Sequence, residues 1–366
     1  MSQVLSPRFA FNPTHPFKPS VSATQRELID LVRSKLDAGE YRLHPTTCPC
    51  GAEKNDALLS EIDRYGLPFK SVLCLSCGTV RIDPYLDEAS LGDFYTHTYR
   101  RMYGMDLEEG TYDSYFASQR SYAEKILATV GDELPEGGWV CEVGCGGGGA
   151  LKTIQDRGFH VAGCDYDTTV MELGKQNGVA NLFYGSIDAI GNAMPEVKFD
   201  LIYLHHVFEH LTDPVAFLNQ CRNFLNPNGQ ILVIVPDIYH IDEIGHPAAV
   251  GNLLMYLHVA HKYNFSIEGV QRLASRAGYC AEKVVPDAEL ETPWSKSPEL
   301  WVKLCLAAAT GENTTSEPVG TRYLKYLKRT ESLYGMGLCK GQIANKLETL
   351  TSPDRLWHKV KRVFAR

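Results

Sequence analysis

The sequence predicts an α/β fold in which a doubly wound parallel sheet follows a small cysteine-containing unit. An apolar segment at 139–143 leads into a run of glycines and then into a helical pattern from Ala150. A second apolar segment, 159–164, ends at Asp165. Strands that alternate with helices in this way are typical of parallel sheets covered on both faces. Before them, two pairs of cysteines between 48 and 77 indicate a separate, loop-rich unit.

The glycine run indicates a ligand site. Glycine lacks a Cβ atom, so Gly144, Gly146 and Gly148 let the backbone turn sharply and approach a ligand closely. Asp165 follows Gly144 by 21 residues (165 minus 144). A carboxylate near this spacing accepts hydrogen bonds from ribose hydroxyls in nucleotide-binding α/β domains. The segment therefore predicts a site for a cofactor that contains a nucleoside.

Two glycine patterns fit the same loop. Gly144, Gly146 and Gly149 satisfy the dinucleotide pattern GxGxxG, whereas Glu142 with three of the glycines satisfies ExGxGxG. Glu142 favours the second pattern, because a carboxylate beside the loop opposes a pyrophosphate at the helix N-terminus. It suits a cofactor that carries an ammonium and a sulfonium. The ExGxGxG pattern resembles that of the class I S-adenosylmethionine-dependent methyltransferases, which have a Rossmann-like fold.

Later segments extend this resemblance over about residues 130–285. Residues 198–204 have the composition of a buried strand and run into HHVFEHLTDP at 205–214. Residues 221–230, CRNFLNPNGQ, then precede an apolar strand at 231–236. This order is similar to the HVLEHL-x-DP … L-x-P-x-G run of the methyltransferase family. The resemblance implies cofactor contacts at Glu142, Gly144, Gly146, Gly148, Asp165, Ser186 and Ile187.

Four of the eleven cysteines have the spacing of a zinc site. Cys48 and Cys50 form one pair, Cys74 and Cys77 form the other, and a glycine follows each pair. Each pair can place two thiolates on a tight turn, and four thiolates suit tetrahedral zinc. The Cys-x-Cys pair is shorter than the usual Cys-x-x-Cys. Because four protein ligands leave no open position, we expect a structural zinc ion.

The combination of a zinc ribbon, a tyrosine-rich segment and this methyltransferase domain resembles a group of bacterial enzymes. They are similar to the deoxysugar C-methyltransferases and to methyltransferases of antibiotic and surface-polysaccharide gene clusters. In those enzymes the middle segment lies over the cofactor and helps to close the substrate site. Here it carries Tyr95, Tyr99, Tyr103, Tyr112 and Tyr115. These tyrosines either stack on a sugar or base, or belong to a connecting helix that simply packs against the protein.

Catalytic residues are expected just after the fourth strand, since ligands of open α/β sheets bind beyond the carboxyl ends of the strands. His206, Glu209 and His210 lie at this position, just after the strand at 198–204. Histidine can take the proton of an acceptor near neutral pH. In the resembling sugar C-methyltransferases, a histidine at the position of His210 is the base or orients it. A hydrogen bond at a helix start is the alternative role. His206 and His210 are predicted to share one helical face.

A second histidine segment, 256–266, resembles the EH-x-Y-x-FS segment of the sugar C-methyltransferases. In those enzymes the Glu-His pair contributes to the acceptor site, which implies a role for His261. Ala260 replaces the glutamate, so the C-methylation mechanism does not carry over directly. Ser266 is predicted to cap the helix that follows.

The histidines also raise a metal hypothesis. His206-x-x-Glu209-His210 is similar to the E-x-x-E-H motif of small-RNA 3′-end and ubiquinone-pathway O-methyltransferases, in which carboxylates and histidine hold a metal. His258 or His261 would supply a further ligand. The first glutamate of the motif is absent here, and histidine-rich sets favour borderline metals such as zinc over magnesium.

Composition limits the partners. A net charge of −8 and a pI of about 5.9 exclude a general nucleic-acid binder. The sequence has no apolar run of transmembrane length and no basic-then-apolar start, so we expect a cytoplasmic protein with reduced cysteines. Residues 352–366 carry five basic residues against Asp354 alone, together with an apolar stripe. This helix either contacts an anionic membrane surface weakly, or docks on the protein itself or on a second subunit of a homo-oligomer.

The chain is predicted to divide into five parts. They are a Pro-rich segment and helix at 1–44, a zinc ribbon at 45–85, a Tyr-rich helical segment at 86–131, an S-adenosylmethionine-binding domain at 132–285, and a helical extension at 286–366 with an apolar helix at 300–309. We predict methyl transfer to a small hydroxylated acceptor, preferably a nucleotide-linked sugar or glycan unit. The alternatives are a metal-assisted O-methyltransferase of a small molecule or RNA end, and a non-catalytic scaffold. The intact glycine loop and Asp165 favour an enzyme over a scaffold. The sequence does not separate C-, N- and O-methylation.

Overall fold

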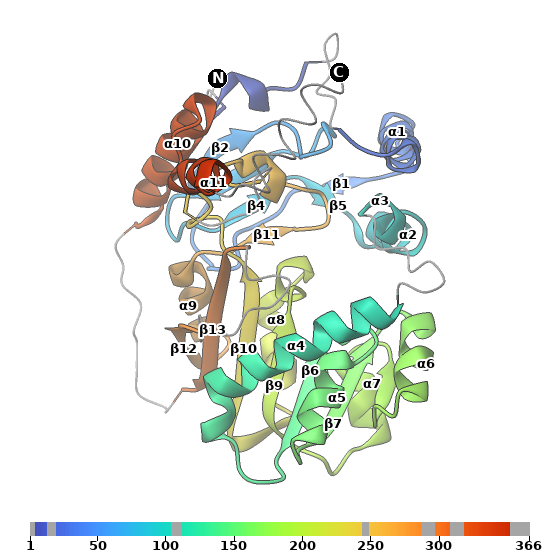
Figure 1. The fold of residues 1–366 in the computed structure, drawn as a ribbon. Coiled ribbons are helices and arrows are strands. Elements are labelled where there is room, and N and C mark those ends of the chain that lie inside the picture. Colours follow the sequence, from blue (N-terminus) through green and yellow to red (C-terminus); the bar gives the residue numbers. More distant parts are fainter. Residues whose placement is uncertain are drawn as a thin grey trace.

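The computed structural model describes residues 4–12, 20–103, 112–243, 249–286, 297–307 and 318–351 (Figure 1). Its main element is a seven-stranded sheet in the order β12-β13-β10-β9-β6-β7-β8. The strands are β6 (Trp139–Val143), β7 (His160–Asp165), β8 (Leu182–Tyr184), β9 (Phe199–His205), β10 (Leu225–Pro236), β12 (Tyr279–Val284) and β13 (Glu299–Leu306). Strands β6 to β10 are parallel, and β13 is antiparallel to its neighbours. The predicted doubly wound α/β fold is confirmed.

Helices cover both faces of this sheet. One face carries α7 (Ile187–Ala193), α8 (Pro214–Cys221) and α9 (Ile267–Arg276), and the other carries α4 (Tyr112–Val130), α5 (Gly149–Asp156) and α6 (Thr168–Gln176). Along β6, Cys141 and Val143 enter the first core cluster and Val140 enters the second. Because both faces are buried, the strands are nearly continuous hydrophobic runs.

Residues 300–306 of the segment predicted as an apolar helix at 300–309 lie in strand β13, so the prediction was wrong for them. Leu300, Val302 and Leu304 enter one core cluster, whereas Trp301 enters the other. A strand buried on both faces is a continuous apolar run, which pattern alone does not distinguish from a buried helix. The sheet therefore includes chain beyond residue 285, and the extension at 286–366 is not wholly helical.

A smaller sheet lies beyond one end of the large one, in the order β11-β4-β3-β2 (Figure 1). Its strands are β2 (Asp56–Ser60), β3 (Ser71–Cys74), β4 (Val80–Ile82) and β11 (Tyr263–Asn264), and β1 (Leu43–His44) pairs separately with β5 (Tyr85–Leu86). Beside them lie α1 (Ala23–Asp37), α2 (Glu88–Phe94), one π-helical turn η2 (Tyr95–Tyr99) and α3 (Arg100–Met102). Since β11 follows β10 in the chain, the cysteine-bearing sheet is completed by residues far downstream.

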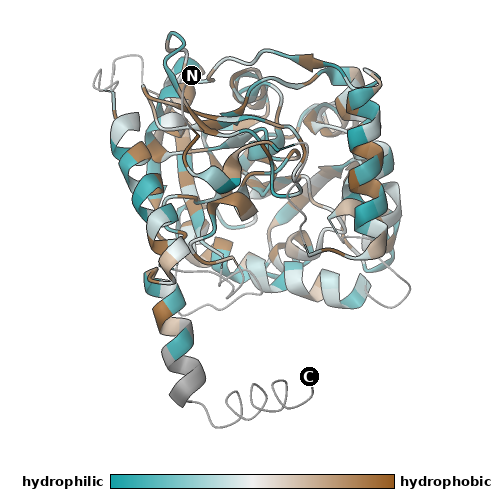
Figure 2. Ribbon diagram, turned by 90° about the horizontal axis from the view of Figure 1, so that it is seen from above, coloured by the Kyte–Doolittle hydropathy of each residue, from teal (hydrophilic) through white to brown (hydrophobic). Residues whose placement is uncertain are grey.

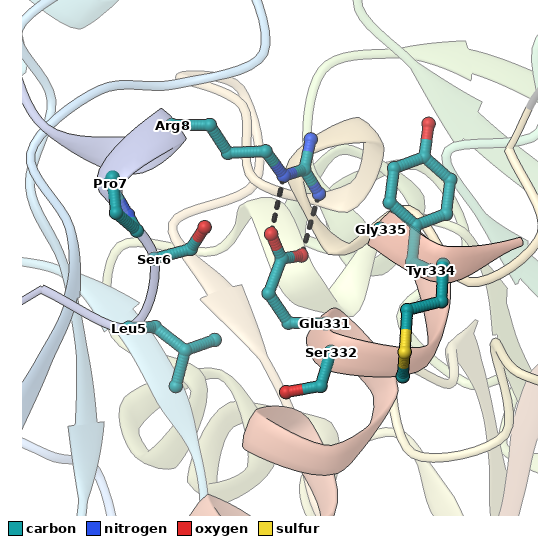
Figure 3. Close-up of a pocket in the computed structure, with 9 residues that line it drawn as sticks. Leu5, Ser6, Pro7, Arg8, Glu331, Ser332, Tyr334 and Gly335 are labelled. Atoms are coloured by element: carbon teal, nitrogen blue, oxygen red, sulfur yellow. Dashed lines mark hydrogen bonds and ion pairs between the residues drawn. The ribbon is translucent and has the colours of Figure 1, made fainter.

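The C-terminal helices are α10 (Gly320–Met336) and α11 (Lys340–Thr351), and the short 3-10 turns are η1 (Pro7–Phe9), η3 (Gly131–Glu133), η4 (Phe208–His210) and η5 (Leu253–Tyr256). Arg8 bonds Glu331 of α10 at 2.5 and 2.7 Å, and both residues line a surface pocket (Figure 3). The last described helix runs away from the body (Figure 2). The predicted basic helix at 352–366 lies outside the described residues. Within the described chain, no helix has the length and apolar character needed to span a membrane.

Candidate active site

The glycine loop at 144–148 joins β6 to α5 at the carboxyl edge of the sheet. Gly144, Gly146 and Gly148 have φ angles of 77°, 53° and 70°, a region that other residues rarely adopt. The loop is also packed too tightly to accommodate side chains at these positions. A Cβ atom on Gly144 would lie 2.3 Å from Val207, and one on Gly146 would lie 2.4 Å from the Tyr115 hydroxyl. The loop therefore requires glycine for its own packing, in addition to any ligand.

Asp165 ends β7 and faces this loop. Its Oδ2 accepts a hydrogen bond from the Gly146 amide, and its Oδ1 accepts one from the Asp167 amide, each at 2.8 Å. The other predicted contacts, Ser186 and Ile187, start α7. The Ser186 side chain caps this helix, and the Ile187 side chain is fully buried in the core. Only the backbone of Ile187 is therefore left for a cofactor.

Helix α4 holds the loop from the opposite side. The Gln119 side chain accepts a hydrogen bond from the Gly149 amide at 3.3 Å and donates one to the Cys145 carbonyl at 3.1 Å. The Tyr115 hydroxyl covers Gly146. The resemblance places the segment with Tyr115 over the cofactor, whereas no motif marks Gln119 as a loop contact, because it lies in the helix before β6.

Glu142 places a buried carboxylate beside the loop. It is only 4% exposed, and its Oε2 atom has no hydrogen-bond partner among the described residues. Burial raises the pKa of Glu142 to about 8. A buried polar atom without a partner is costly. A cationic ligand group, such as the ammonium of S-adenosylmethionine, would satisfy it, so the residues present fit this cofactor.

A second cluster lies just beyond β9, where Val207 contacts the glycine loop. Glu209 is 1% exposed, and neither of its carboxylate oxygens makes a hydrogen bond within the described structure. Its Oε1 atom lies 3.5 Å from His206 Nδ1, 4.0 Å from His210 Nε2 and 3.7 Å from His261 Nε2. Folding thus brings the four predicted catalytic residues together.

His206 does not share a helical face with His210, contrary to the prediction. It has a left-handed φ of 54°, and the 3-10 turn η4 begins only at Phe208. His206 Nε2 lies 2.9 Å from an oxygen of Glu299. Burial disfavours the imidazolium, but the carboxylates of Glu209 and Glu299 raise the pKa of His206 to about 10. His206 is therefore a cation between two carboxylates.

Glu299 is a site residue that the sequence pattern does not reveal. It begins β13, the segment predicted to be helical. Besides His206, it accepts hydrogen bonds from the Tyr122 hydroxyl at 2.7 Å and the Trp301 indole at 3.1 Å. Burial opposes its ionisation, but the neighbouring histidines hold the pKa of Glu299 well below its usual range. Its contacts become evident only once β13 is placed next to β10.

The remaining histidines of the cluster are neutral near pH 7. Burial lowers the pKa of His210, and lowers that of His261 further. For Glu209, burial raises the pKa but His206 and His210 lower it, and the net shift is downward. The cluster thus combines a carboxylate, one imidazolium and imidazoles that can accept a proton.

Tyrosines of the predicted Tyr-rich segment cover this cluster. The Tyr95 hydroxyl lies 2.9 Å from His210 Nδ1, and the Tyr103 hydroxyl lies 2.9 Å from His258 Nδ1. The ring of Tyr99 meets that of His210 edge-on, with 6.0 Å between the ring centroids. These side chains therefore pack directly against the histidines.

The same segment also contacts the chain just after Asp165. Arg100 forms an ion pair of 2.6 Å with Asp167, two residues after Asp165. Burial is the main cause that raises the pKa of Tyr99 to about 12, and Glu209 and Asp165 both contribute. The Tyr99 phenol therefore lies within electrostatic reach of both clusters.

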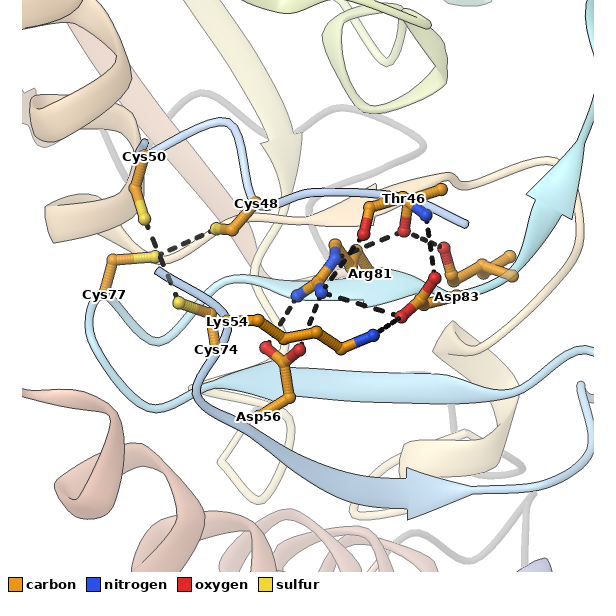
Figure 4. Close-up of polar contacts among 10 residues, drawn as sticks. Thr46, Cys48, Cys50, Lys54, Asp56, Cys74, Cys77, Arg81 and Asp83 are labelled. Atoms are coloured by element: carbon orange, nitrogen blue, oxygen red, sulfur yellow. Dashed lines mark hydrogen bonds and ion pairs between the residues drawn. The ribbon is translucent and has the colours of Figure 1, made fainter. Parts of the chain in front are cut away.

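The four cysteines predicted to bind zinc gather as free thiols next to the small sheet (Figure 4): Cys48, Cys50, Cys74 and Cys77. The sulfur atoms of Cys48 and Cys77 are 3.5 Å apart, and those of Cys50 and Cys74 are 3.9 Å apart. Zinc–sulfur bonds of about 2.3 Å in a tetrahedron place sulfurs about 3.8 Å apart. The cluster therefore fits a zinc ion. Beside it, buried Arg81 pairs with Asp56 at 2.7 Å (Figure 4).

The cysteine cluster is tied to the segment that carries His261. Strand β11, which follows His261, pairs with β4, which follows Cys77. Ser266 donates its hydroxyl to the Cys77 carbonyl at 2.6 Å and accepts a hydrogen bond from the Gly269 amide at 2.9 Å. The predicted N-cap at Ser266 is thus confirmed. It also links the cysteines to the segment between His261 and α9.

The comparison with known families agrees with this architecture. Residues 115–283 match the family described as "Methyltransferase domain", a span that holds the glycine loop, Asp165 and the histidine cluster. The chain contains a class I methyltransferase domain. The order of its sheet, with one antiparallel strand between the last parallel strand and the edge, is that of the Rossmann-like fold expected from the resemblance.

Relatives of this methyltransferase domain have varied names. It is 28% identical over 172 residues to a ubiquinone biosynthesis O-methyltransferase of Pseudomonas fluorescens, covering 45% of this chain and 65% of the relative. It is 26% identical over 162 residues to phosphoethanolamine N-methyltransferase 2 of Caenorhabditis elegans, covering 42% and 35%. Among solved structures, the plantazolicin methyltransferase BamL matches with 15% identity and a TM-score of 0.45, over 59% of this chain and 94% of that one. The match thus spans less than two thirds of either curated relative.

Proposed function

We propose that this protein transfers a methyl group from S-adenosylmethionine to a small hydroxylated acceptor. The observation that carries the proposal is Glu142, a buried carboxyl group beside the glycine loop whose Oε2 atom has no hydrogen-bond partner among the described residues. Glu142 would hold the cationic end of the cofactor, and Asp165 would accept from the ribose hydroxyls. When bound, the cofactor supplies a methyl group on a sulfonium.

The histidine cluster would receive the acceptor. Methyl transfer needs in-line placement and a group that takes the acceptor's proton. His206 is already a cation, so it cannot accept a proton. His210 is neutral, and its Nδ1 contact with Tyr95 leaves Nε2 facing Glu209. As the acceptor atom gains the methyl group, His210 Nε2 would take its proton, and Glu209 would stabilise the imidazolium.

Within this reaction, we propose a nucleotide-linked sugar or a glycan unit as the acceptor. Support comes from the tyrosines packed against the histidines, Tyr95, Tyr99 and Tyr103, since phenol rings can stack on a sugar face. These tyrosines lie in the part of the chain before residue 115, outside the matched domain. We further propose that the four cysteines bind a structural zinc ion that fixes this part of the chain.

The acceptor can be identified with cofactor labelled at its methyl group. Purified full-length protein is incubated with nucleotide sugars, free sugars, phenols and amines in separate reactions, and products are detected by mass spectrometry. We expect label in a nucleotide sugar or glycan, and none with the Asp165→Asn variant. Label in a phenol or amine alone would overturn the acceptor class, and no label with any acceptor, together with binding of NAD, would overturn the reaction.

A further inference from the structure

We propose that Cys280 and Cys305 are a modification site, at which a low-molecular-weight disulfide such as oxidised glutathione converts the two thiols to an intrachain disulfide. The two residues face each other across the edge of the large sheet, where β12 pairs with β13. Oxidation would tie the edge strand β12 covalently to β13. The site is separate from the four cysteines beside the small sheet, and it does not depend on methyl transfer.

The first argument is the exposure of the two thiols. The chain has eleven cysteines, of which Cys280 is exposed and Cys305 is partly exposed, whereas all the others are buried. Oxidation and thiol exchange select the thiols that solvent reaches. A small disulfide in solution can therefore react with this pair more readily than with the remaining cysteines of the chain.

The second argument is the distance between the two residues. Cys280 and Cys305 are direct partners in an antiparallel ladder. Two residues away on each strand, the Ala307 amide donates a hydrogen bond to the Gly278 carbonyl at 3.0 Å, so Cys280 and Cys305 also form a hydrogen-bonded pair. In such a pair the Cα atoms lie about 5.5 Å apart. Disulfides join Cα atoms that are about 4.4–6.8 Å apart, so the strand spacing already suits the bond.

The third argument is the direction of the side chains. Residues directly opposite each other in an antiparallel pair project to the same face of the sheet. The Cys280 thiol donates a hydrogen bond across the strands to the Cys305 carbonyl at 3.4 Å. The next pair on this face, Glu282 and Lys303, forms an ion pair of 2.9 Å. Facing side chains therefore already meet here, and rotation about the Cα–Cβ bonds would bring the two sulfurs together.

The reaction is a thiol–disulfide exchange in two steps. The Cys280 thiolate attacks one sulfur of oxidised glutathione, whose S–S bond breaks, so that one glutathione thiol leaves and a mixed disulfide remains. The Cys305 thiolate then attacks the Cys280 sulfur, and the second glutathione thiol leaves. The protein loses two electrons and two protons, which the two glutathione thiols carry away. Cys280 reacts first, because it is more exposed and because burial raises the pKa of the Cys305 thiol.

The disulfide would stabilise an edge strand. Within the described sheet, β12 pairs with β13 alone. The bond would join residues 25 positions apart in the chain (305 minus 280), which restrains the unfolded chain and favours the paired strands. An exposed disulfide is also accessible to thiols that reduce it again. The pair would therefore respond to the ratio of thiol to disulfide around the protein.

Oxidised glutathione tests this site in the full-length protein without cofactor or acceptor. The protein is reduced, freed of reductant and incubated with oxidised glutathione, and its unreduced peptides are mapped by mass spectrometry. The wild type should give one cross-linked peptide pair that contains Cys280 and Cys305 and has lost two hydrogen atoms. Amide hydrogen exchange in β12 should slow, and dithiothreitol should reverse both changes.

The two single variants are matched controls for the two steps. Cys305→Ser should stop at the mixed disulfide on Cys280, because no second thiol displaces the glutathione. Cys280→Ser should keep the Cys305 thiol largely unmodified, because that thiol is less exposed. Both variants should have the melting temperature of the reduced wild type.

Three outcomes would overturn the proposal. A wild type that stops at the mixed disulfide, as expected of Cys305→Ser, would show that the two sulfurs do not meet. A wild type that keeps both thiols would show that the oxidant does not reach them. A disulfide found only between two chains would show that the bond does not form across the strands. Because no methyl donor takes part, failure of the proposed reaction would leave these results unchanged.

Discussion

The cofactor side and the acceptor side of this site are assembled in different ways. On the cofactor side, Glu142, the glycine loop and Asp165 lie on consecutive elements between residues 142 and 165. The acceptor side combines η2, η4, the segment before β11 and the first residue of β13. The first is continuous in the chain, and the second exists only after distant segments have packed together.

This difference implies that the two sides can be perturbed separately. The cofactor side rests on the large sheet and on helix α4, whose Gln119 side chain holds the glycine loop. The acceptor side is also held by the small cysteine-bearing sheet, because β4 pairs with β11 and Ser266 donates a hydrogen bond to the Cys77 carbonyl. We expect changes on the first side to alter cofactor affinity, and changes on the second side to alter turnover.

The largest expected effect follows from the double change Cys74→Ser and Cys77→Ser. Structural zinc in small domains contributes about 10 kcal/mol or more of binding free energy. Its loss should therefore unfold the small sheet. Methyl transfer should fall to background, while S-adenosylmethionine affinity changes only a few-fold. Hydrogen exchange and calorimetry measure the two outcomes.

The exposed thiol of Cys280 on β12 provides the control, and Cys280→Ser should behave as wild type. If the double variant kept its metal and full activity, the proposed role of the cysteines in supporting the acceptor side would be wrong.

On the cofactor side, Asp165→Asn should lower S-adenosylmethionine affinity about 100-fold, because hydrogen bonds to charged groups are worth about 1.5–3 kcal/mol each. The change removes an acceptor of the Gly146 amide and the expected ribose contact. Titration calorimetry provides the measurement, with Asp188→Asn, at an exposed position in α7, as the control. Unchanged affinity in Asp165→Asn would contradict this placement of the cofactor.

On the acceptor side, Glu299→Gln should lower kcat about 30-fold, as for other partners that orient active-site histidines. Cofactor affinity should stay unchanged. Loss of one of the two carboxylates lowers the pKa of His206 from about 10 toward neutrality. The plot of kcat against pH should therefore show an additional pH-dependent step between about pH 7 and 10. The matched control is Glu282→Gln, exposed on β12. A fall in cofactor affinity equal to the fall in kcat would show that the two sides are not separable.

The smallest effect concerns Glu142 and pH. Its pKa of about 8 means that it is protonated in the free protein near neutral pH, and binding an ammonium requires the carboxylate. Affinity should therefore rise with pH, by somewhat less than tenfold between pH 6 and 7, with release of a proton. The rise ends near pH 8, where an α-amino group loses its own charge. Calorimetry in buffers of different ionisation enthalpy detects the proton, and Glu142→Gln should abolish the dependence.

The contrast also explains what the sequence could predict. The glycine loop, Asp165 and the two cysteine pairs are local patterns, so their chemistry can be inferred before the chain folds. The contacts of Tyr95 with His210 and of Glu299 with His206 join segments far apart in the chain. Glu299 is still harder to identify from the sequence, because the apolar run of β13 resembles a buried helix. His206 departs from the predicted helix because the backbone turns left-handed at that residue.

The most direct test of the central claim is titration of the full-length protein with S-adenosylmethionine and, separately, with NAD. We predict that S-adenosylmethionine binds at one site per chain, that NAD gives no binding heat, and that Glu142→Gln weakens binding without lowering the melting temperature. Binding of NAD in place of S-adenosylmethionine would contradict the assignment of the loop between Glu142 and Asp165.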